Sequence, residues 1–209
     1  MKSLSSGIIL SGGSSRRFGT DKALVSVEGK TLIQYVLDAV MPLVHETLVV
    51  VKTLEQGKII KEVCKEPFIL AFDESEVNSP LAGTLAGMKE ARGGVSLLLA
   101  CDTPLLSPDV LSFLLHLGRS YDAVVPRWPN GNIEPLQAAY NTAKIRKAAA
   151  EAIEAKELRM YDAIKHLRNV LYVSTEALKQ MDPDLRTFQN INTPSDLERV
   201  RILLRSRPR

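Results

Sequence analysis

The sequence lacks the features that mark membrane, disulfide-rich and zinc-binding proteins. None of its apolar runs approaches the roughly 18 residues of a membrane span. Its two cysteines, Cys64 and Cys101, have no CxxC or Cys/His spacing, so neither a zinc site nor a disulfide framework is expected. Its three histidines stand apart from one another, in predicted helices or at helix ends. The sequence therefore indicates no membrane partner, and we expect the chemistry to reside in other residue types.

The chain also lacks a large excess of charge of either sign. The 27 basic and 24 acidic residues give a net charge of +3 and, apart from the C-terminal RVRILLRSRPR, the basic residues are spread along the chain. No nucleic-acid partner is expected, since that would require a clustered basic face. The first ten residues contain only a four-residue apolar stretch, which is too short for an export signal. We expect a cytoplasmic protein.

Short apolar runs alternate with helical patterns over the first 120 residues. The runs are rich in Val, Ile and Leu, as strands covered on both faces are, and lie at residues 7–10, 47–51, 69–72 and 95–100. Amphipathic helices are predicted between or after them, at residues 31–44, 80–91 and 108–117. The alternation predicts an α/β fold around a parallel sheet.

The regular alternation of strand and helix patterns ends after Tyr121. DAVVP and EPLQAAY read as strands that flank the turn signal RWPNGN, and the segment 127–137 is a candidate substrate lid. Two helices over 143–168, a strand near 170–173 and a final helix follow. Thr193 fits the N-cap of that helix, with Pro194 at its first position and Asp196 three residues after the cap. At 209 residues with 45% hydrophobic content, the chain is interpreted as a single domain.

The most informative segment is GIILSGGSSRRFGTDK, residues 7–22. Glycines such as Gly12 and Gly13 lack a Cβ atom, so successive backbone N–H groups can turn toward one anion. Arg17 and Lys22 add the charge that a polyphosphate requires; the spacing favours Arg17 over its neighbouring arginine. The segment has neither the GKS/GKT ending of a P-loop nor a GxGxxG pattern, which weakens the ATPase and dinucleotide interpretations.

Asp102 follows a second buried run, VSLLLACDTP. Because ligands of open α/β sheets bind beyond the carboxyl ends of the strands, Asp102 and the glycine loop are expected to share one cleft. Backbone amides after Ser11, with Arg17 and Lys22, would face a nucleoside triphosphate, and Asp102 would hold Mg²⁺. This predicts nucleotidyl transfer, in which a phosphate oxygen attacks the α-phosphorus and pyrophosphate leaves.

Each of these signals also has a purely structural explanation. A glycine-rich turn can serve chain geometry alone, and Asp102 can cap the turn before Pro104. Asp73, after FILAF, and Asn190 and Asn192, near the last helix, are residue types common in loops. These alternatives stay open at the level of single residues.

The string LSGGSSRRFGTDK resembles the signature LAGGxSxRMGxDK of the MobA-like molybdenum cofactor guanylyltransferases, a branch of the nucleotidyltransferase superfamily. Three further segments look like family motifs in the same order: SPLAGTLAGM at 79–88, ACDTPLL at 100–106 and FQNINTP at 188–194. The resemblance implies a Rossmann-like three-layer sandwich with a mostly parallel sheet. It also implies transfer of GMP from GTP to molybdenum-loaded molybdopterin, with protein partners that deliver the pterin.

The resemblance also assigns residues. The contacts with GTP that it implies are those of Leu10, Ser11, Gly12, Gly13, Lys22, Asp73 and Asp102. Among these, Lys22 would meet the phosphates, Asp73 the guanosine portion and Asp102 the Mg²⁺. Asn190 and Asn192 would lie on the pterin side. The nucleotide-binding half is then about residues 1–120, and the acceptor-binding half about 121–209.

One departure from the family pattern concerns the base. The family commonly places an asparagine after the second strand, whereas Lys52 and Thr53 stand there in VVVKT. The choice of GTP over CTP, which related cytidylyltransferases for the pterin cofactor use, therefore stays open. So do cobinamide phosphate or a sugar phosphate as acceptor, and a non-catalytic nucleotide-binding module. The presence of both Lys22 and Asp102 favours an enzyme.

Overall fold

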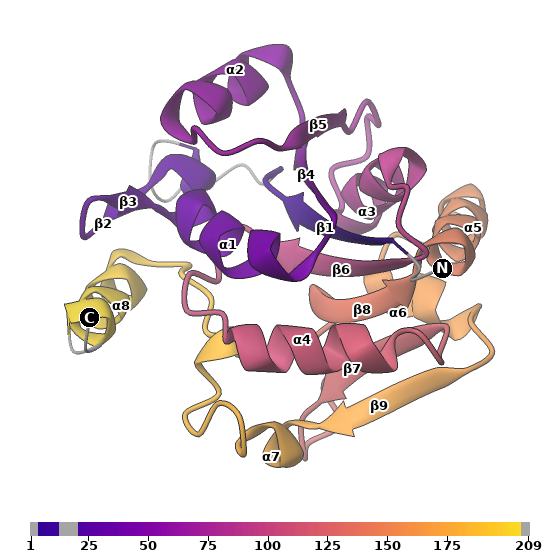
Figure 1. Ribbon diagram of the computed structural model, residues 1–209. Helices are drawn as coiled ribbons and strands as arrows, with labels where there is room; N and C mark the ends of the chain where they lie inside the picture. The colour runs from indigo at the N-terminus through magenta and orange to yellow at the C-terminus, as the bar shows by residue number, and fades with distance from the viewer. Residues whose placement is uncertain (1–3, 13–20, 206–209) are drawn as a thin grey trace.

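A computed structural model describes residues 4–12 and 21–205, which form one sheet of seven strands, a small hairpin and surrounding helices (Figure 1). Across the large sheet the strands are β5 (Ile69–Phe72), β4 (Glu46–Val51), β1 (Ser5–Leu10), β6 (Val95–Ala100), β8 (Gln137–Asn141), β7 (Ala123–Arg127) and β9 (Val170–Ser174). β8 is antiparallel to both of its neighbours, and every other pairing is parallel. The predicted mostly parallel sheet is confirmed.

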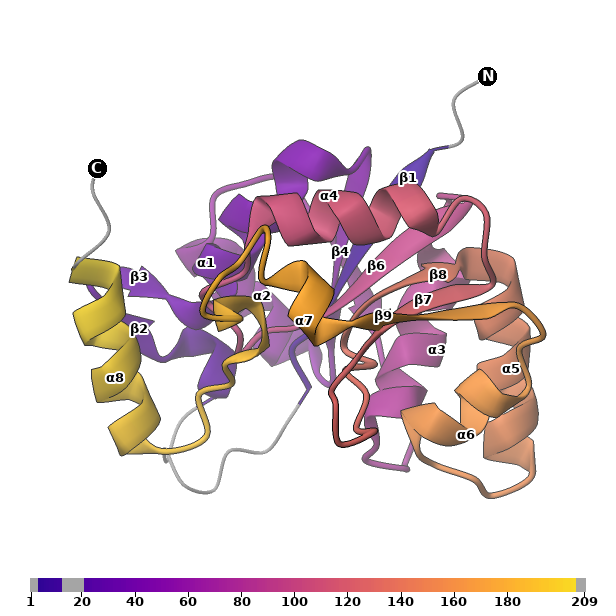
Figure 2. The ribbon, with the colours of Figure 1, turned by 90° about the horizontal axis from the view of Figure 1, so that it is seen from below.

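Helices cover both faces of this sheet (Figure 2). One face carries α1 (Leu32–Val40), α2 (Leu54–Val63), α4 (Pro108–Leu117) and α7 (Thr175–Leu178). The other carries α3 (Pro80–Glu90), α5 (Thr142–Glu154) and α6 (Met160–Lys165). Ile8 and Ile9 in β1 point to opposite faces and both are fully buried, which explains why the central strands are continuously apolar. The three-layer sandwich is confirmed.

The remaining elements gather at one side of the sheet. The short strands β2 (Ser26–Val27) and β3 (Lys30–Thr31) form a hairpin, and α8 (Pro194–Arg205) lies beside it (Figures 1 and 2). A small apolar cluster joins this hairpin, α1, the loop after β6 and α8; its buried members are Val27, Leu32, Leu105, Ile191 and Val200. Glu28 adds ion pairs with Arg201 and Arg205. The last helix is thus attached to the N-terminal third of the chain.

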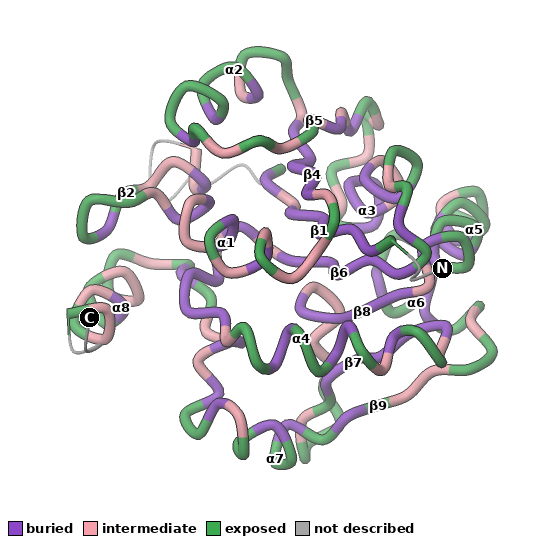
Figure 3. Tube along the Cα trace, in the orientation of Figure 1, coloured by how far each residue is buried: buried purple, intermediate pink, exposed green. Residues whose placement is uncertain are grey.

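Two local features differ from the sequence expectations. The helix predicted over 31–44 ends at Val40, and Pro42, which cannot continue an α-helix, lies in a 3-10 turn at Met41–Leu43. α2 was not predicted at all. Most of its surface is exposed (Figure 3), and Gly57 and Ile60 are its only buried residues, so it lacks the apolar stripe on which helix prediction depends. Among the described helices, none is long and apolar enough to cross a membrane.

The contact of α3 with the sheet generates a stability prediction. A Cβ atom added at Gly87 would lie 2.5 Å from Ile8 Cγ2 and 3.0 Å from Val50 Cγ2. We therefore expect Gly87→Ala to lower the free energy of unfolding by about 1–3 kcal/mol through overpacking, as measured by urea denaturation. Gly83→Ala is the matched control, because the nearest atom to its Cβ would be the flexible end of Leu10 at 3.4 Å, with Asp73 Oδ2 and Val50 Cγ1 at 3.8 Å, all ordinary van der Waals distances. Equal stability of the two variants would contradict the prediction.

Candidate active site

The parallel strands β5, β4, β1 and β6 all end at the same edge of the sheet. The register pairs Leu10 of β1 with Val50 of β4 and Ala100 of β6, so the residues that follow these strands are neighbours. Gly12 follows β1, Lys52 follows β4, Asp73 follows β5 and Asp102 follows β6. The predicted meeting of the glycine-loop strand and Asp102 at one edge is therefore observed.

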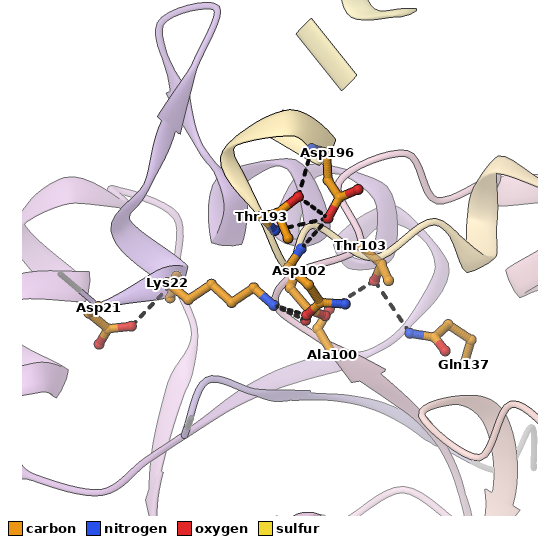
Figure 4. A network of polar contacts seen from close by, with 10 residues as sticks. Asp21, Lys22, Ala100, Asp102, Thr103, Gln137, Thr193 and Asp196 are labelled. Carbon is orange, nitrogen blue, oxygen red and sulfur yellow. Dashed lines mark hydrogen bonds and ion pairs between the residues drawn. The ribbon is translucent and has the colours of Figure 1, made fainter. Parts of the chain in front are cut away.

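Lys22 and Asp102 form an ion pair at this edge (Figure 4). The distance from Lys22 Nζ to Asp102 Oδ2 is 2.5 Å, and the ammonium also donates to Asn192 Oδ1 at 2.8 Å. Lys22 opens a 3-10 turn, Lys22–Leu24, whose first residues are capped by Asp21: its Oδ1 accepts from the N–H of Ala23. Three segments that are far apart in the sequence thus converge on one ammonium group.

The second carboxylate oxygen of Asp102 is available to bind a cation. Asp102 Oδ1 is buried and has no hydrogen-bond partner among the described residues, a costly state for a carboxylate oxygen. A cation would satisfy it. No group of three or more His, Cys, Asp or Glu side chains able to hold a metal occurs in residues 4–12 and 21–205. A single carboxylate is enough for an ion such as Mg²⁺, because Mg²⁺ commonly combines one or two carboxylates with substrate phosphates and waters. The free oxygen of Asp102 fits such an ion.

The loop before α8 is fixed against this centre. The N–H of Ile191 donates to the carbonyl of Asp102 at 2.9 Å. Asp196 Oδ2 accepts from the N–H of Asn192 and from the N–H and hydroxyl of Thr193, and Thr193 Oγ1 accepts from the N–H of Asp196. The predicted capping arrangement is confirmed. Asn190 and Asn192 are both exposed, and Asn192 Oδ1 accepts from Lys22 Nζ. The pterin-side role of both stays a prediction.

Asp73 forms a second ion pair at the same edge. It is only 5% exposed; its Oδ2 lies 2.6 Å from Lys52 Nζ and its Oδ1 accepts from the N–H of Ser75. Lys52 Nζ also donates to the carbonyls of Ser75 and Val77. The stem of Lys52 packs near Gly12, where an added Cβ would be 3.4 Å from its Cγ. Both oxygens of the Asp73 carboxylate therefore already have partners within the chain.

The two residues at the departure from the family pattern therefore have different places. Lys52 faces the site, whereas Thr53 caps α2, its hydroxyl accepting from the N–H of Gln56 at 3.1 Å. Gln56 itself was missed by the sequence analysis. Its side chain contacts Ser11, Asp21 and the backbone of Lys52. No motif marks a single glutamine in a largely exposed helix, so no sequence signal pointed to it.

Other predicted residues have plainer outcomes. Gly13 and Arg17 lie outside the described residues. The turn predicted between β7 and β8 is confirmed, with Gly131 at φ +88° and its N–H donating to the carbonyl of Trp128; the lid role of residues 127–137 stays a prediction. Cys101 packs in the core, and burial raises the pKa of its thiol, so this thiol is protonated at neutral pH.

The protein-family model described as "MobA-like NTP transferase domain" matches residues 7–170. The chain belongs to this MobA-like family of nucleotidyltransferases. Relatives described as "Probable molybdenum cofactor guanylyltransferase" are 33% identical in Methanosarcina mazei, covering 95% of this chain and 91% of the relative, and 33% identical in Pyrococcus horikoshii, covering 90% and 95%. The chain is thus an enzyme of the nucleotidyl-transferring class, whose members generally use a divalent metal ion.

Solved structures agree with the family. Molybdopterin-guanine dinucleotide biosynthesis protein A from Archaeoglobus fulgidus is 28% identical, with a TM-score of 0.83 over 97% of this chain and all of that chain. A 4-diphosphocytidyl-2C-methyl-D-erythritol synthase from Anaerococcus prevotii is 15% identical, with a TM-score of 0.72 over 97% and 96%. The second likeness shows the fold alone. The MobA-like chain therefore shares its architecture with this synthase as well as with the Archaeoglobus fulgidus protein.

The cap of α8 gives a pH-dependence prediction. The N–H of Asn192 and the hydroxyl of Thr193 hydrogen-bond to Asp196 and lower the pKa of its carboxyl below the ordinary value. Asp196 therefore stabilises the fold above its unfolded-state pKa of about 3.9, and this contribution is lost as the pH falls through the lower folded value. We expect Asp196→Asn to be less stable than the parent chain at pH 7.

The difference should shrink toward zero once the pH lies below the lowered pKa of folded Asp196, because the carboxyl is then protonated in both the folded and the unfolded chain. Urea denaturation at pH 7 and at an acid pH below that pKa measures it. Glu198→Gln is the control, because Glu198 lies exposed on the same helix, where it pairs with Arg201. A stability loss for Asp196→Asn that is equal at both pH values would contradict the prediction.

Proposed function

We propose that this chain transfers GMP from GTP to molybdenum-loaded molybdopterin and releases pyrophosphate. The observation that carries the proposal is the pairing of Lys22 with Asp102, whose second oxygen is buried without a partner. It joins a phosphate-binding cation to a metal-binding carboxylate at the edge where ligands of such sheets bind. The relatives' names supply the nucleotide and the acceptor class. They match this chain over nine-tenths of its length.

In the proposed complex, Lys22 exchanges Asp102 for the triphosphate. Its ammonium then offsets the charge that grows on the departing pyrophosphate, together with Arg17 and the backbone N–H groups after Ser11. Asp102 is the residue that would hold Mg²⁺, which when bound neutralises the phosphate oxygens and polarises the reacting phosphoryl group. The acceptor phosphate is itself the nucleophile, so no side-chain nucleophile is needed. The chain's main contribution is to orient two anions that repel each other.

The further contacts with GTP are assigned to Leu10, Ser11, Gly12, Gly13 and Asp73, of which Asp73 would meet the guanosine portion. Because Asp73 is paired with Lys52, binding of guanosine by its carboxylate includes a rearrangement of that ion pair. Asn190, Asn192 and the half from about residue 121 to 209 are assigned to the pterin. Asn192 lies next to Lys22, which is where the acceptor phosphate must approach the triphosphate.

The first test is pyrophosphate release from purified protein, Mg²⁺ and molybdenum-loaded molybdopterin. We expect release with GTP and little with CTP, ATP or UTP. Release with CTP would overturn the guanine assignment and turn attention to Lys52. If none of the nucleotides releases pyrophosphate until a sugar phosphate or cobinamide phosphate replaces the pterin, the named acceptor is wrong.

The second test separates binding from turnover. We expect Asp102→Asn to lower kcat at least about a hundredfold and to weaken GTP binding much less, because the cation held there acts most strongly on the transition state. Asp109→Asn is the matched control, since Asp109 is an exposed aspartate in the first turn of α4. Unchanged turnover of Asp102→Asn would remove Asp102 from the mechanism.

A further inference from the structure

The carboxamide of Gln56 connects three parts of the site. Its Nε2 donates to the carbonyl of Ser11 at 3.0 Å and to Asp21 Oδ2 at 2.6 Å. Its Oε1 accepts from the N–H of Lys52 at 2.8 Å. Both amide hydrogens and the carbonyl oxygen are therefore used. One side chain joins the end of β1, the residue before Lys22 and the end of β4.

The link to Asp21 matters because Asp21 sets the position of Lys22. One carboxylate oxygen of Asp21 caps the 3-10 turn that begins at Lys22, and the other is held by Gln56. From that turn the Lys22 side chain extends to Asp102 and Asn192 (Figure 4). A lysine stem has four rotatable bonds and gains precision only if its backbone is fixed. The contacts of Gln56 and Asp21 supply that fixation from the β4 side of the site.

Packing does not account for Gln56. α2 buries only Gly57 and Ile60 and exposes Leu54 by 68% and Val63 by 46%. A polar side chain on the inner side of such a helix adds little apolar burial. Its hydrogen bond to a carboxylate is of the stronger, charge-assisted kind. The geometry of Gln56 therefore points to placement of neighbouring groups rather than to support of the core.

We infer that Gln56 is a positioning residue for triphosphate binding, acting through Asp21 on Lys22. The inference rests on the proposed function and adds to it a residue outside the four family-like segments. Since Lys22 would meet phosphates and not the base, the effect of Gln56 that passes through Lys22 is independent of the base. Loss of Gln56 weakens the binding of GTP, CTP and inorganic tripolyphosphate by the same factor. That factor is about tenfold, as expected for one charge-assisted hydrogen bond.

The test compares Gln56→Leu with Gln34→Leu in the full chain. The control removes a hydrogen bond of the same chemistry, Gln34 Nε2 to Asp38 Oδ1 at 2.9 Å, on α1. Calorimetric titration with Mg²⁺ and each of the three probes gives the dissociation constants, and thermal unfolding shows that the variants fold. We expect about a tenfold loss for Gln56→Leu with every probe that the parent chain binds, and none for Gln34→Leu.

A double-variant comparison shows whether the effect passes through Lys22. In a Lys22→Ala background the additional effect of Gln56→Leu should be less than about twofold, because the group being positioned is gone. A full tenfold loss in that background, or equal binding by Gln56→Leu and Gln34→Leu, overturns the inference and leaves the proposed function intact. If the parent chain binds no triphosphate, the proposed function fails, and the inference fails with it.

An exchange of donor and acceptor supplies a rescue. Gln56→Glu places a carboxylate against Asp21, so triphosphate binding should weaken at least as much as in Gln56→Leu. Adding Asp21→Asn turns the repulsive contact into an amide-to-carboxylate hydrogen bond, while its carbonyl can still cap the N–H of Ala23. We expect the double variant to bind triphosphate at least about threefold more tightly than Gln56→Glu. Additive losses in the double variant would overturn the role of the Gln56–Asp21 contact. This readout also holds if Gln56→Leu does not fold.

Discussion

The parallel pairing of β5, β4, β1 and β6 is the constraint on which the site depends. Parallel neighbours in register end at the same edge, so the polar residues that follow them must share it. Nonpolar side chains on both faces fix that register, because a one-residue shift would reverse which face each side chain meets. Leu10 opposite Val50 and Ala100 is the visible result. The hydrophobic core thus determines where Lys52, Asp73 and Asp102 can lie.

Electrostatics then decides how these side chains coexist. A carboxylate that leaves water requires a charged partner or several hydrogen-bond donors. Asp73 has a charged partner in Lys52 on one oxygen and one backbone donor, the N–H of Ser75, on the other. Asp102 has Lys22 on one oxygen and no partner among the described residues on the other. The asymmetry distinguishes a satisfied carboxylate from one that can still accept a cation, and it agrees with the different roles proposed for the two aspartates.

The C-terminal part of the chain completes the site from outside the parallel strands. α8 is held to the N-terminal hairpin by the cluster around Ile191 and by the ion pairs of Glu28. Its cap fixes Asn192, and the N–H of Ile191 bonds to the carbonyl of Asp102. Residues near both ends of the described chain therefore meet at Lys22. The position of Asn192, which is proposed for the acceptor side, therefore depends on contacts between distant parts of the domain.

The sequence by itself determined the central strands, α3, α4, the β7–β8 turn and the cap at Thr193, because these features depend on local patterns of apolar residues, proline, glycine and hydroxyl groups. It also indicated Lys22 and Asp102, since glycine loops and strand-end carboxylates have recognisable spacing. Only the tertiary structure showed that Lys52 neutralises Asp73 and that Gln56 joins Ser11 to Asp21. These contacts join residues 21 to 45 positions apart, and neither Lys52 nor Gln56 belongs to a recognisable motif. Their partners are chosen by how β1, β4 and α2 pack, which no local sequence signal encodes.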